Sequence, residues 1–453
     1  MYAFRKVRFT TAATALVFGT GLGLPASAGA TALAASQDSS TCTVSSVTAA
    51  ADQTQKPWEI ADANPGHLTD ANGTPLDGTG VKVAVIDTGI QSQTQLSVAG
   101  GVVLNGESTG YAADDDGHGT MVASIIAAQK VPGGNGMQGI APGVQLLSIR
   151  EAGCNAPSGN DEDTMATGID DAVDEGAEVI NISQDGYDDD SKLAAAVQYA
   201  YDNGVVIVTS AGNQGDRDTT DNNGTDYGVN PRTYPASYPN VLAVGAVDQY
   251  GTVPTFSETG SAKNTYYVGV VAPGVAVGGL VPKGTIAIDD GTSFAAPYVA
   301  AEAALIMEEH GWNQSGDRTA ARAYDVIKII EATADGDGAY SASQGWGEAD
   351  IQNALATKLG SGDSLVSPGN TISGLTRMLG AGPNADGQAT TSQTDVNRTV
   401  IKPYVAASVN QEAQKQQRWA YIALGAGILV AIVALAGAAV ARDAARRRGQ
   451  PQS

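Results

Sequence analysis

Short apolar runs alternate with amphipathic stretches through the middle of the chain. The run at 81–86 has the length and the β-branched content of a buried strand. The segment 162–175 instead places Met165, Ile169 and Val173 on one helical face, at intervals of four residues. Strands that alternate with helices predict a mostly parallel sheet covered on both faces. Further predicted strands are 144–149, 178–183, 205–210 and 241–247, and further predicted helices are 118–129 and 191–203.

The alternating pattern occupies residues 57–356, which we predict to form one α/β domain. Residues 29–56 are rich in Ala, Ser, Thr and Gln, and we interpret them as an N-terminal extension without a core of its own. Residues 357–418 lose the periodicity and favour Ser, Gly, Asn, Gln and Thr, which predicts a flexible stalk. A small ordered module inside that stalk is an open alternative.

The N-terminus has the pattern of a signal peptide over residues 1–28. Basic residues precede an apolar stretch at 12–24, and small residues suited to signal peptidase follow at 26–28. A second small-residue motif at 32–34 is an alternative cleavage site. A permanent anchor is disfavoured because the apolar stretch is short and rich in Gly.

Near the C-terminus, residues 419–441 carry no charge and are long enough for a helix to cross a membrane. Trp419 and Tyr421 stand at one edge, where interfacial aromatic residues are common. Arginines concentrate in the tail 442–453, which the positive-inside rule places in the cytoplasm. We therefore expect a single-pass protein of the cell membrane with its α/β domain outside.

The charge balance is strongly acidic. Lys and Arg total 25 against 48 Asp and Glu, a formal net charge of -23. Without a basic stripe for phosphate groups, binding to nucleic acid is disfavoured. The cysteines are Cys42 and Cys154, and cysteines of an exported chain usually pair, so we expect a disulfide between them. The Cys and His residues lack zinc-site spacing, and we predict neither a metal nor a cofactor.

Three blocks of sequence carry groups suited to nucleophilic catalysis. Asp87 ends the predicted strand at 81–86, His118 starts a predicted helix, and Ser293 opens another. A free serine is a poor nucleophile at neutral pH and needs a base, for which the pKa of histidine is suitable. A buried carboxylate then fixes the histidine tautomer and stabilises the imidazolium. These three residues are our candidate catalytic triad.

A fourth group is needed to stabilise the oxyanion of a tetrahedral intermediate. Asn213 follows the predicted strand at 205–210, where its amide would point toward the site. We predict that Asn213 donates to the oxyanion together with the backbone N–H of Ser293.

The order acid, histidine, serine, with the local motifs Val-Ile-Asp87-Thr-Gly, Gly-His118-Gly-Thr and Gly-Thr-Ser293-Phe-Ala, resembles the subtilisin family of serine peptidases. The likeness covers about residues 80–356. It implies a subtilisin-like three-layer α/β fold with a mostly parallel central sheet, here followed by the C-terminal transmembrane helix. The order excludes an α/β-hydrolase, which runs serine, acid, histidine.

Within that family the chain resembles the mycosins, membrane-anchored proteases associated with type VII secretion. The cysteine-bearing extension, the motif Gly139-Ile-Ala-Pro, the strand Val179-Ile-Asn-Ile-Ser and the C-terminal membrane helix carry this likeness. It implies cleavage of secreted proteins at the outer face of the membrane and association with a secretion membrane complex. A structural subunit of such a complex and a general surface protease are the alternatives.

Several further residues have two interpretations. Ser183 is followed by Gln184-Asp185-Gly186, where many subtilisins have Leu-Gly, so Asp185 either selects a basic residue or is a solvated loop acid; we favour the second. The acids at 114–116 either set the local field at His118 or lie in a solvated turn, and we favour the turn. The acids at 188–190 lack the alternating spacing of calcium ligands. Surface or capping roles are expected for His67 and His310, and a structural hydrogen bond for Asn181.

Overall fold

The computed structural model describes residues 68–70, 73–132, 136–153, 162–220, 224–260, 268–313, 318–336 and 340–357. The predicted signal peptide, extension, stalk, membrane helix and tail lie outside these residues, as do His67, Cys42 and Cys154. No helix within the described ranges has both the length and the apolar character needed to cross a membrane. The membrane segment at 419–441 therefore stays a prediction.

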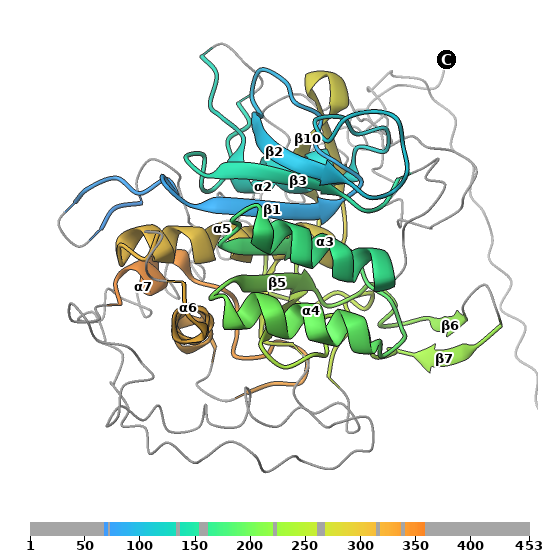
Figure 1. Ribbon diagram of the computed structural model, residues 1–453. Coiled ribbons are helices and arrows are strands. Elements are labelled where there is room, and N and C mark those ends of the chain that lie inside the picture. The colour runs from blue at the N-terminus through green and yellow to red at the C-terminus, as the bar shows by residue number, and fades with distance from the viewer. Residues whose placement is uncertain are drawn as a thin grey trace, which may run out of the picture.

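The core of the fold is a seven-stranded sheet in which every neighbouring pair of strands is parallel (Figure 1). The strand order is β2-β3-β1-β4-β5-β8-β9. The mostly parallel sheet predicted from the sequence is therefore confirmed. The strands are β1 Lys82–Asp87, β2 Val98–Val103, β3 Gln145–Arg150, β4 Val179–Ile182, β5 Val206–Ser210, β8 Val241–Val247 and β9 Val270–Pro273.

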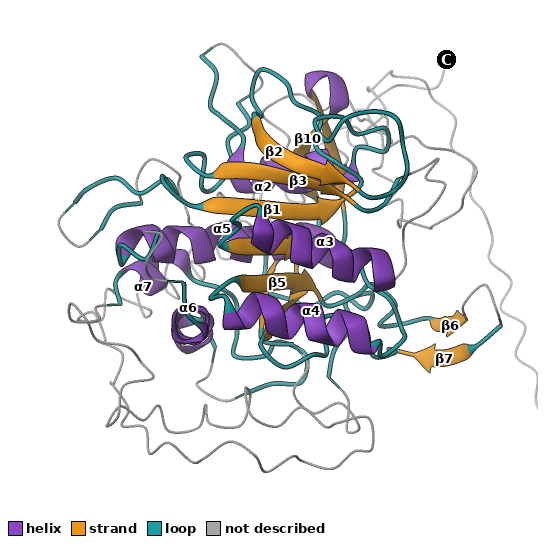
Figure 2. Ribbon diagram, viewed as in Figure 1, coloured by secondary structure: helices purple, strands orange, loops and turns teal. Residues whose placement is uncertain are grey.

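Helices cover both faces of this sheet, and two antiparallel hairpins lie outside it (Figure 2). In the view of Figure 1, α3 and α4 lie in front of the sheet, and α2 and α5 lie behind it. The helices are α2 His118–Ala127, α3 Glu162–Asp174, α4 Ser191–Asp202, α5 Thr292–Glu309, α6 Ala320–Thr333, α7 Ile351–Leu355 and the short 3-10 helix η1 Pro282–Gly284. The hairpin strands are β6 Asp218–Thr220 with β7 Asp226–Val229, and β10 Val277–Val281 with β11 Thr285–Asp289.

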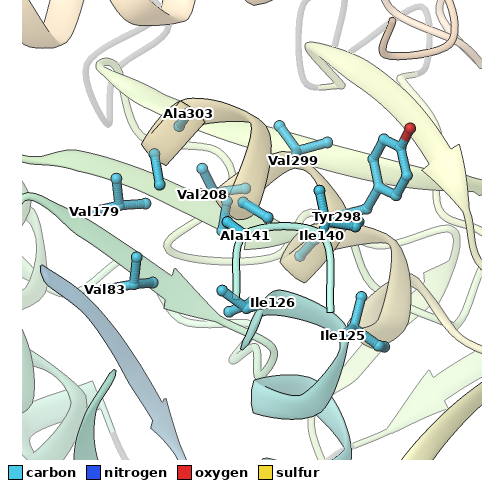
Figure 3. Close-up of a cluster of buried hydrophobic side chains, with 14 of the residues drawn as sticks. Val83, Ile125, Ile126, Ile140, Ala141, Val179, Val208, Tyr298, Val299 and Ala303 are labelled. Carbon is cyan, nitrogen blue, oxygen red and sulfur yellow. The ribbon is translucent and has the colours of Figure 1, made fainter. Parts of the chain in front are cut away.

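Alternate side chains of each strand pack into two separate cores. Ala84 and Ile86 of β1 face the layer of α3 and α4, where Ile169 is fully buried. Val83 and Val85 face the opposite layer, formed mainly by α2 and α5. Figure 3 shows side chains of this second core gathered from strands and both helices. Since both faces are buried, the strands read as continuous apolar runs rather than alternating ones.

The chain changes direction across the sheet on either side of β1. From β1 the chain runs to β2 and β3 on one side, and then crosses to β4 on the other. In open parallel sheets, ligand sites form at the carboxyl ends of the strands that flank such a point. Asp87 ends β1, and Ser183 follows the adjacent end of β4, where Ile86 lies opposite Ile182.

The boundaries of the predicted elements differ from the sequence predictions by at most two residues, and several other elements were not predicted. Strand β2 contains two glycines and is only partly buried, so its pattern is not that of a core strand. The β10–β11 hairpin continues directly into the loop before α5. It therefore stands next to the segment that carries Ser293.

Candidate active site

Asp87 and His118 form a hydrogen-bonded pair at the carboxyl end of β1. The His118 Nδ1 atom lies 2.8 Å from Asp87 Oδ1 and 3.0 Å from Asp87 Oδ2. Asp87 is fully buried and also accepts a 2.7 Å hydrogen bond from the backbone N–H of Thr88. His118 is the first residue of α2, so the helix fixes its position beside the strand end. With Nδ1 held as a donor to the carboxylate, Nε2 is the nitrogen available to a substrate.

Two glycines let the helix approach the strand this closely. Gly117, the N-cap of α2, has a φ of 106°, which is strained for any residue with a side chain. A Cβ placed on Gly119 would lie 2.2 Å from the carbonyl oxygen of Gly89 and 3.0 Å from Asp87 Oδ1. The glycines on either side of His118 are therefore required by geometry.

The surrounding charges favour the protonated form of His118. Burial alone lowers the pKa of His118, but Asp87, Asp116 and Asp114 outweigh it and raise the pKa to about 9. Asp289, at the end of β11, is half-buried, and burial raises its pKa while the positive charge of His118 acts in the opposite direction. Four carboxylates therefore influence the protonation of this imidazole.

Asp114 organises the pair, a role that the sequence did not reveal. Its Oδ2 accepts from both the backbone N–H and the hydroxyl of Thr120, and its Oδ1 accepts from the N–H of Gly117 and the hydroxyl of Thr88. Thr88 accepts in turn from the N–H of Gly119. Asp114 is buried, so the prediction of a solvated turn is wrong at this position. The acid ties the end of β1 to the start of α2.

Ser293 is the second residue of α5 and is almost fully buried. Its hydroxyl donates to the carbonyl of Ser183 at 3.1 Å, and the hydroxyl of Ser183 donates to the carbonyl of Ser293 at 2.8 Å. The N–H of Ser293 lies in the first helical turn, where no helical carbonyl is available to accept it. Asn181 donates to the Ser183 hydroxyl, which confirms the structural hydrogen bond expected for Asn181.

The helix of Ser293 meets the helix of His118. The ring of Phe294, the residue after Ser293, lies 5.5 Å from the His118 ring between centroids. The amino ends of α2 and α5 thus come together at one end of the sheet. Ser293 precedes Phe294 and therefore lies in the part of α5 that contacts the ring of His118.

Asn213 lies at the same end of the sheet, three residues after β5. Its Oδ1 accepts from the backbone N–H of Thr292 at 2.9 Å and from the Thr292 hydroxyl at 3.0 Å. That hydroxyl also accepts from the N–H of Gly212. Since the amide oxygen is held by these donors, the Nδ2 group is left to donate elsewhere. The predicted residues Asp87, His118, Ser293 and Asn213 therefore gather in one place.

The remaining singled-out residues have other positions. His310 is the C-cap of α5, which is one of the two roles expected for it. Its ring stacks on that of Trp312 with the centroids 4.5 Å apart, and burial lowers the pKa of His310 to about 4. Asp190 is the N-cap of α4 and accepts from the N–H groups of Lys192 and Leu193. Among the described residues, no group of three or more His, Cys, Asp or Glu side chains is arranged to hold a metal ion.

The sequence model of the subtilase family matches residues 78–347 of the chain. The chain is 39% identical over 235 residues to subtilisin DY of Bacillus licheniformis. The matched segment covers 51% of this chain and 78% of the relative. It is 34% identical over 255 residues to subtilisin Savinase of Lederbergia lenta. That matched segment covers 56% of this chain and 85% of the relative.

Solved mycosin structures share the same fold. The structure of MycP1 with its N-terminal propeptide removed superposes with a TM-score of 0.54 at 30% identity, over 67% of this chain and 99% of that protein. The MycP3 protease from a type VII (ESX-3) secretion system gives a TM-score of 0.51 at 30% identity, over 67% of this chain and 88% of that protein.

Proposed function

The chain belongs to the subtilase family and is a subtilisin-like serine endopeptidase, and we propose that Asp87, His118 and Ser293 are its catalytic triad. The observation that carries this assignment is the pair of short contacts between His118 Nδ1 and the buried carboxylate of Asp87. A carboxylate in that position orients the ring and stabilises the imidazolium that forms during catalysis.

In the proposed reaction, Ser293 first turns about χ1, from the carbonyl of Ser183 toward Nε2 of His118. His118 accepts the hydroxyl proton as Ser293 Oγ attacks the scissile carbonyl. The ring then donates that proton to the departing amine, which leaves an ester of Ser293. Water, deprotonated by His118, hydrolyses the ester and regenerates the hydroxyl.

Asn213 and the N–H of Ser293 are the proposed donors to the oxyanion. The amide of Asn213 is oriented by Thr292, so Nδ2 is fixed before substrate arrives. A donor held in place needs no reorganisation as charge develops, and removing one such donor typically costs about 100- to 1000-fold in kcat.

Comparing the purified protein with the Ser293→Ala and His118→Ala variants on an unfolded protein substrate tests this assignment. The wild type should hydrolyse the substrate and both variants should lose nearly all activity, while unfolding at the same temperature. Full hydrolysis by the folded Ser293→Ala variant would contradict the proposal.

For the cellular role, we infer a mycosin that cleaves secreted proteins at the outer face of the cell membrane, beside a type VII secretion complex. Support comes from the mycosin fold likeness, including a protein described as an essential component of a type VII system. The uncharged segment at 419–441 supports a membrane anchor, and the arginine-rich tail supports an external peptidase domain.

The alternative roles make different predictions in the cell. If cleavage of secreted proteins is the function, Ser293→Ala should abolish processing of a secreted substrate. A structural subunit would instead need the folded protein but not Ser293, so secretion and processing would survive this change. A general surface protease would degrade many unfolded proteins when purified, whereas a processing enzyme should show a narrow range.

A further inference from the structure

Asp185 lies in the segment that follows β4, two residues after the hydrogen-bonding partner of Ser293. The carbonyl of Ser183, two residues before Asp185, accepts from the Ser293 hydroxyl. The next residue, Gly186, exchanges two backbone hydrogen bonds with Tyr234, of 3.0 and 2.9 Å. Asp185 is therefore anchored on both sides by its neighbours, at a fixed place near the nucleophile.

The segments after β4 and β5 flank the place where a substrate side chain must begin. These two strands are parallel neighbours, so their carboxyl ends lie side by side. One segment carries Asp185 and the other carries Asn213. A scissile carbonyl carbon at Ser293, with its oxygen on Asn213, has its own Cα only about 1.5 Å away. The side chain on that Cα, which belongs to the residue before the cleaved bond, therefore starts between the two segments.

The carboxylate of Asp185 has no compensating partner within the described part of the chain. No hydrogen-bond donor or basic side chain there contacts it, and the residue still keeps partial exposure. Burial raises the pKa of Asp185 to about 6. Asp185 is half-buried and lies between segments that are tied down by hydrogen bonds, so its position differs from that of a fully solvated loop acid. A charge withdrawn from water is normally paired, so the position favours a positively charged ligand.

A second carboxylate lies behind the neighbouring segment. Glu258 is fully buried and accepts from the backbone N–H of Gln214 at 3.1 Å. A Cβ on Gly212 would lie 2.6 Å from the carboxyl carbon of Glu258. Burial first, and then the charges of Asp185 and Glu258, raise the pKa of Tyr187 above its ordinary value, so both acids act on the same phenol.

Further charged and titratable groups surround the segment of Asp185. The rings of Tyr227 of β7 and Tyr187 are tilted with their centroids 5.0 Å apart, and the Tyr227 hydroxyl donates to Asp188. Burial raises the pKa of Tyr234, while the charge and the hydrogen bond of Arg232 act in the opposite direction. Glu162 of α3 adds a carboxylate on this side, since a Cβ on Gly186 would lie 2.2 Å from Glu162 Oε1, so acids outnumber the single cation Arg232 among the groups named here.

We propose that Asp185 selects substrates in which the residue before the cleaved bond is Lys or Arg, with Glu258 adding to the negative field. The inference rests on the proposed function, because it assumes that Ser293 is the nucleophile. A cationic head group entering between the two segments would pair with the carboxylate of Asp185. A neutral side chain of the same size would leave that carboxylate without a partner.

Two fluorogenic peptides that differ only in Arg or citrulline before the cleaved bond test the proposal. Citrulline has nearly the shape of Arg without its charge. The wild type should cleave the Arg peptide with at least about tenfold higher kcat/KM, the range of one desolvated charge pair. In Asp185→Asn, that ratio should fall close to one while cleavage of the citrulline peptide is retained.

The exposed acid Asp188 supplies the matched control, since Asp188→Asn removes a charge three residues away and should leave the ratio unchanged. In the wild type, the ratio should also fall as pH drops through about 6, because kcat/KM reports the protonation of the free enzyme. His118 affects both peptides equally and cancels from the ratio.

The outcomes separate this inference from the proposed function. A wild-type ratio near one, or an Asp185→Asn ratio equal to that of the wild type, overturns the selection of basic residues while leaving Ser293 as nucleophile. If neither peptide is cleaved and Ser293 does not react with a fluorophosphonate probe, the triad assignment itself fails. A lowered unfolding temperature of Asp185→Asn does not affect the test, because the wild-type pH dependence is an independent measurement.

Discussion

Ser183 and Ser293 each donate a hydroxyl hydrogen bond to the carbonyl of the other, at 2.8 and 3.1 Å. This reciprocal pair joins the end of the central strand β4 to the first turn of α5. The bond from Ser183 to the Ser293 carbonyl fixes the backbone of the proposed nucleophile. The bond from Ser293 occupies its hydroxyl proton and must break before attack.

Replacing Ser183 by Ala should therefore destabilise the site. The variant removes two buried hydrogen bonds and leaves the carbonyl of Ser293 and the amide of Asn181 each short of a partner, at a cost of about 1–3 kcal/mol in the free energy of unfolding. Urea unfolding of the Ser293→Ala background, which prevents self-digestion, measures this cost. Stability equal to that background would show that the Ser183 hydroxyl contributes nothing to the fold.

The activity should increase toward alkaline pH. Ser293 needs a neutral imidazole, and the pKa of His118 is raised to about 9, so kcat/KM should increase as pH rises through about 9. Asp116→Asn removes one of the charges that raise this pKa and should move the midpoint to lower pH. A pH–rate profile of both proteins measures the shift, and identical midpoints would contradict the role of Asp116.

The same pKa shift predicts that stability changes with pH in the opposite direction to activity: the contribution of His118 to the free energy of unfolding should decrease as pH rises. Because the folded pKa of His118 lies above its ordinary value of 6.5, its protonation stabilises the folded state fully below about pH 6.5. This contribution should be lost as pH rises through about 9. Thermal unfolding of Ser293→Ala against the double variant Ser293→Ala/His118→Gln, from pH 6 to 10, should show a difference that shrinks with pH. A difference that grows with pH would have the wrong sign.

Asp114 should matter more for stability than its sequence context suggests. Asp114→Ala leaves the hydroxyls of Thr88 and Thr120 and the N–H groups of Gly117 and Thr120 without their acceptor. The expected loss is at least about 3 kcal/mol in the free energy of unfolding, since each unsatisfied buried donor typically costs 1–3 kcal/mol. The exposed neighbour Asp115 is the control, and Asp115→Ala should change stability far less. Equal effects of the two variants would refute the organising role of Asp114.

Asn213 can be tested with two variants that differ in what they retain. Asn213→Asp keeps an oxygen to accept from Thr292 but loses the Nδ2 donor, while Asn213→Ala loses both. Both should lower kcat by roughly 100-fold or more, with KM changing much less, since the interaction forms in the transition state. Steady-state kinetics on one peptide checks this. Retention of full kcat in Asn213→Asp would remove Asn213 from the oxyanion site.

The sequence predicted the parts of the site that lie in local motifs at strand and helix ends. Asp87 follows an apolar run and His118 begins a helix, and the topology of a parallel sheet brings such ends to one edge. Asn213 was predicted for the same reason. The alternation of strands and helices likewise predicted the parallel sheet and its two helical layers.

Contacts between distant segments were not predictable from the sequence. In the run of acids at 114–116, one carboxylate is buried and another is exposed, a difference set by Thr88 and Thr120 rather than by local composition. The reciprocal bonds of Ser183 and Ser293 join residues 110 positions apart. Strand β2 was missed because its two glycines interrupt the apolar pattern.

Mapping the site of reaction with a fluorophosphonate probe tests the central claim most directly. The probe is attacked by an activated serine and stays attached, so peptide mass spectrometry identifies the residue. The account predicts a single adduct on Ser293, absent from Ser293→Ala and formed far more slowly in His118→Ala and Asp87→Ala. An adduct on another serine, or labelling of Ser293 at the same rate without His118, would contradict it.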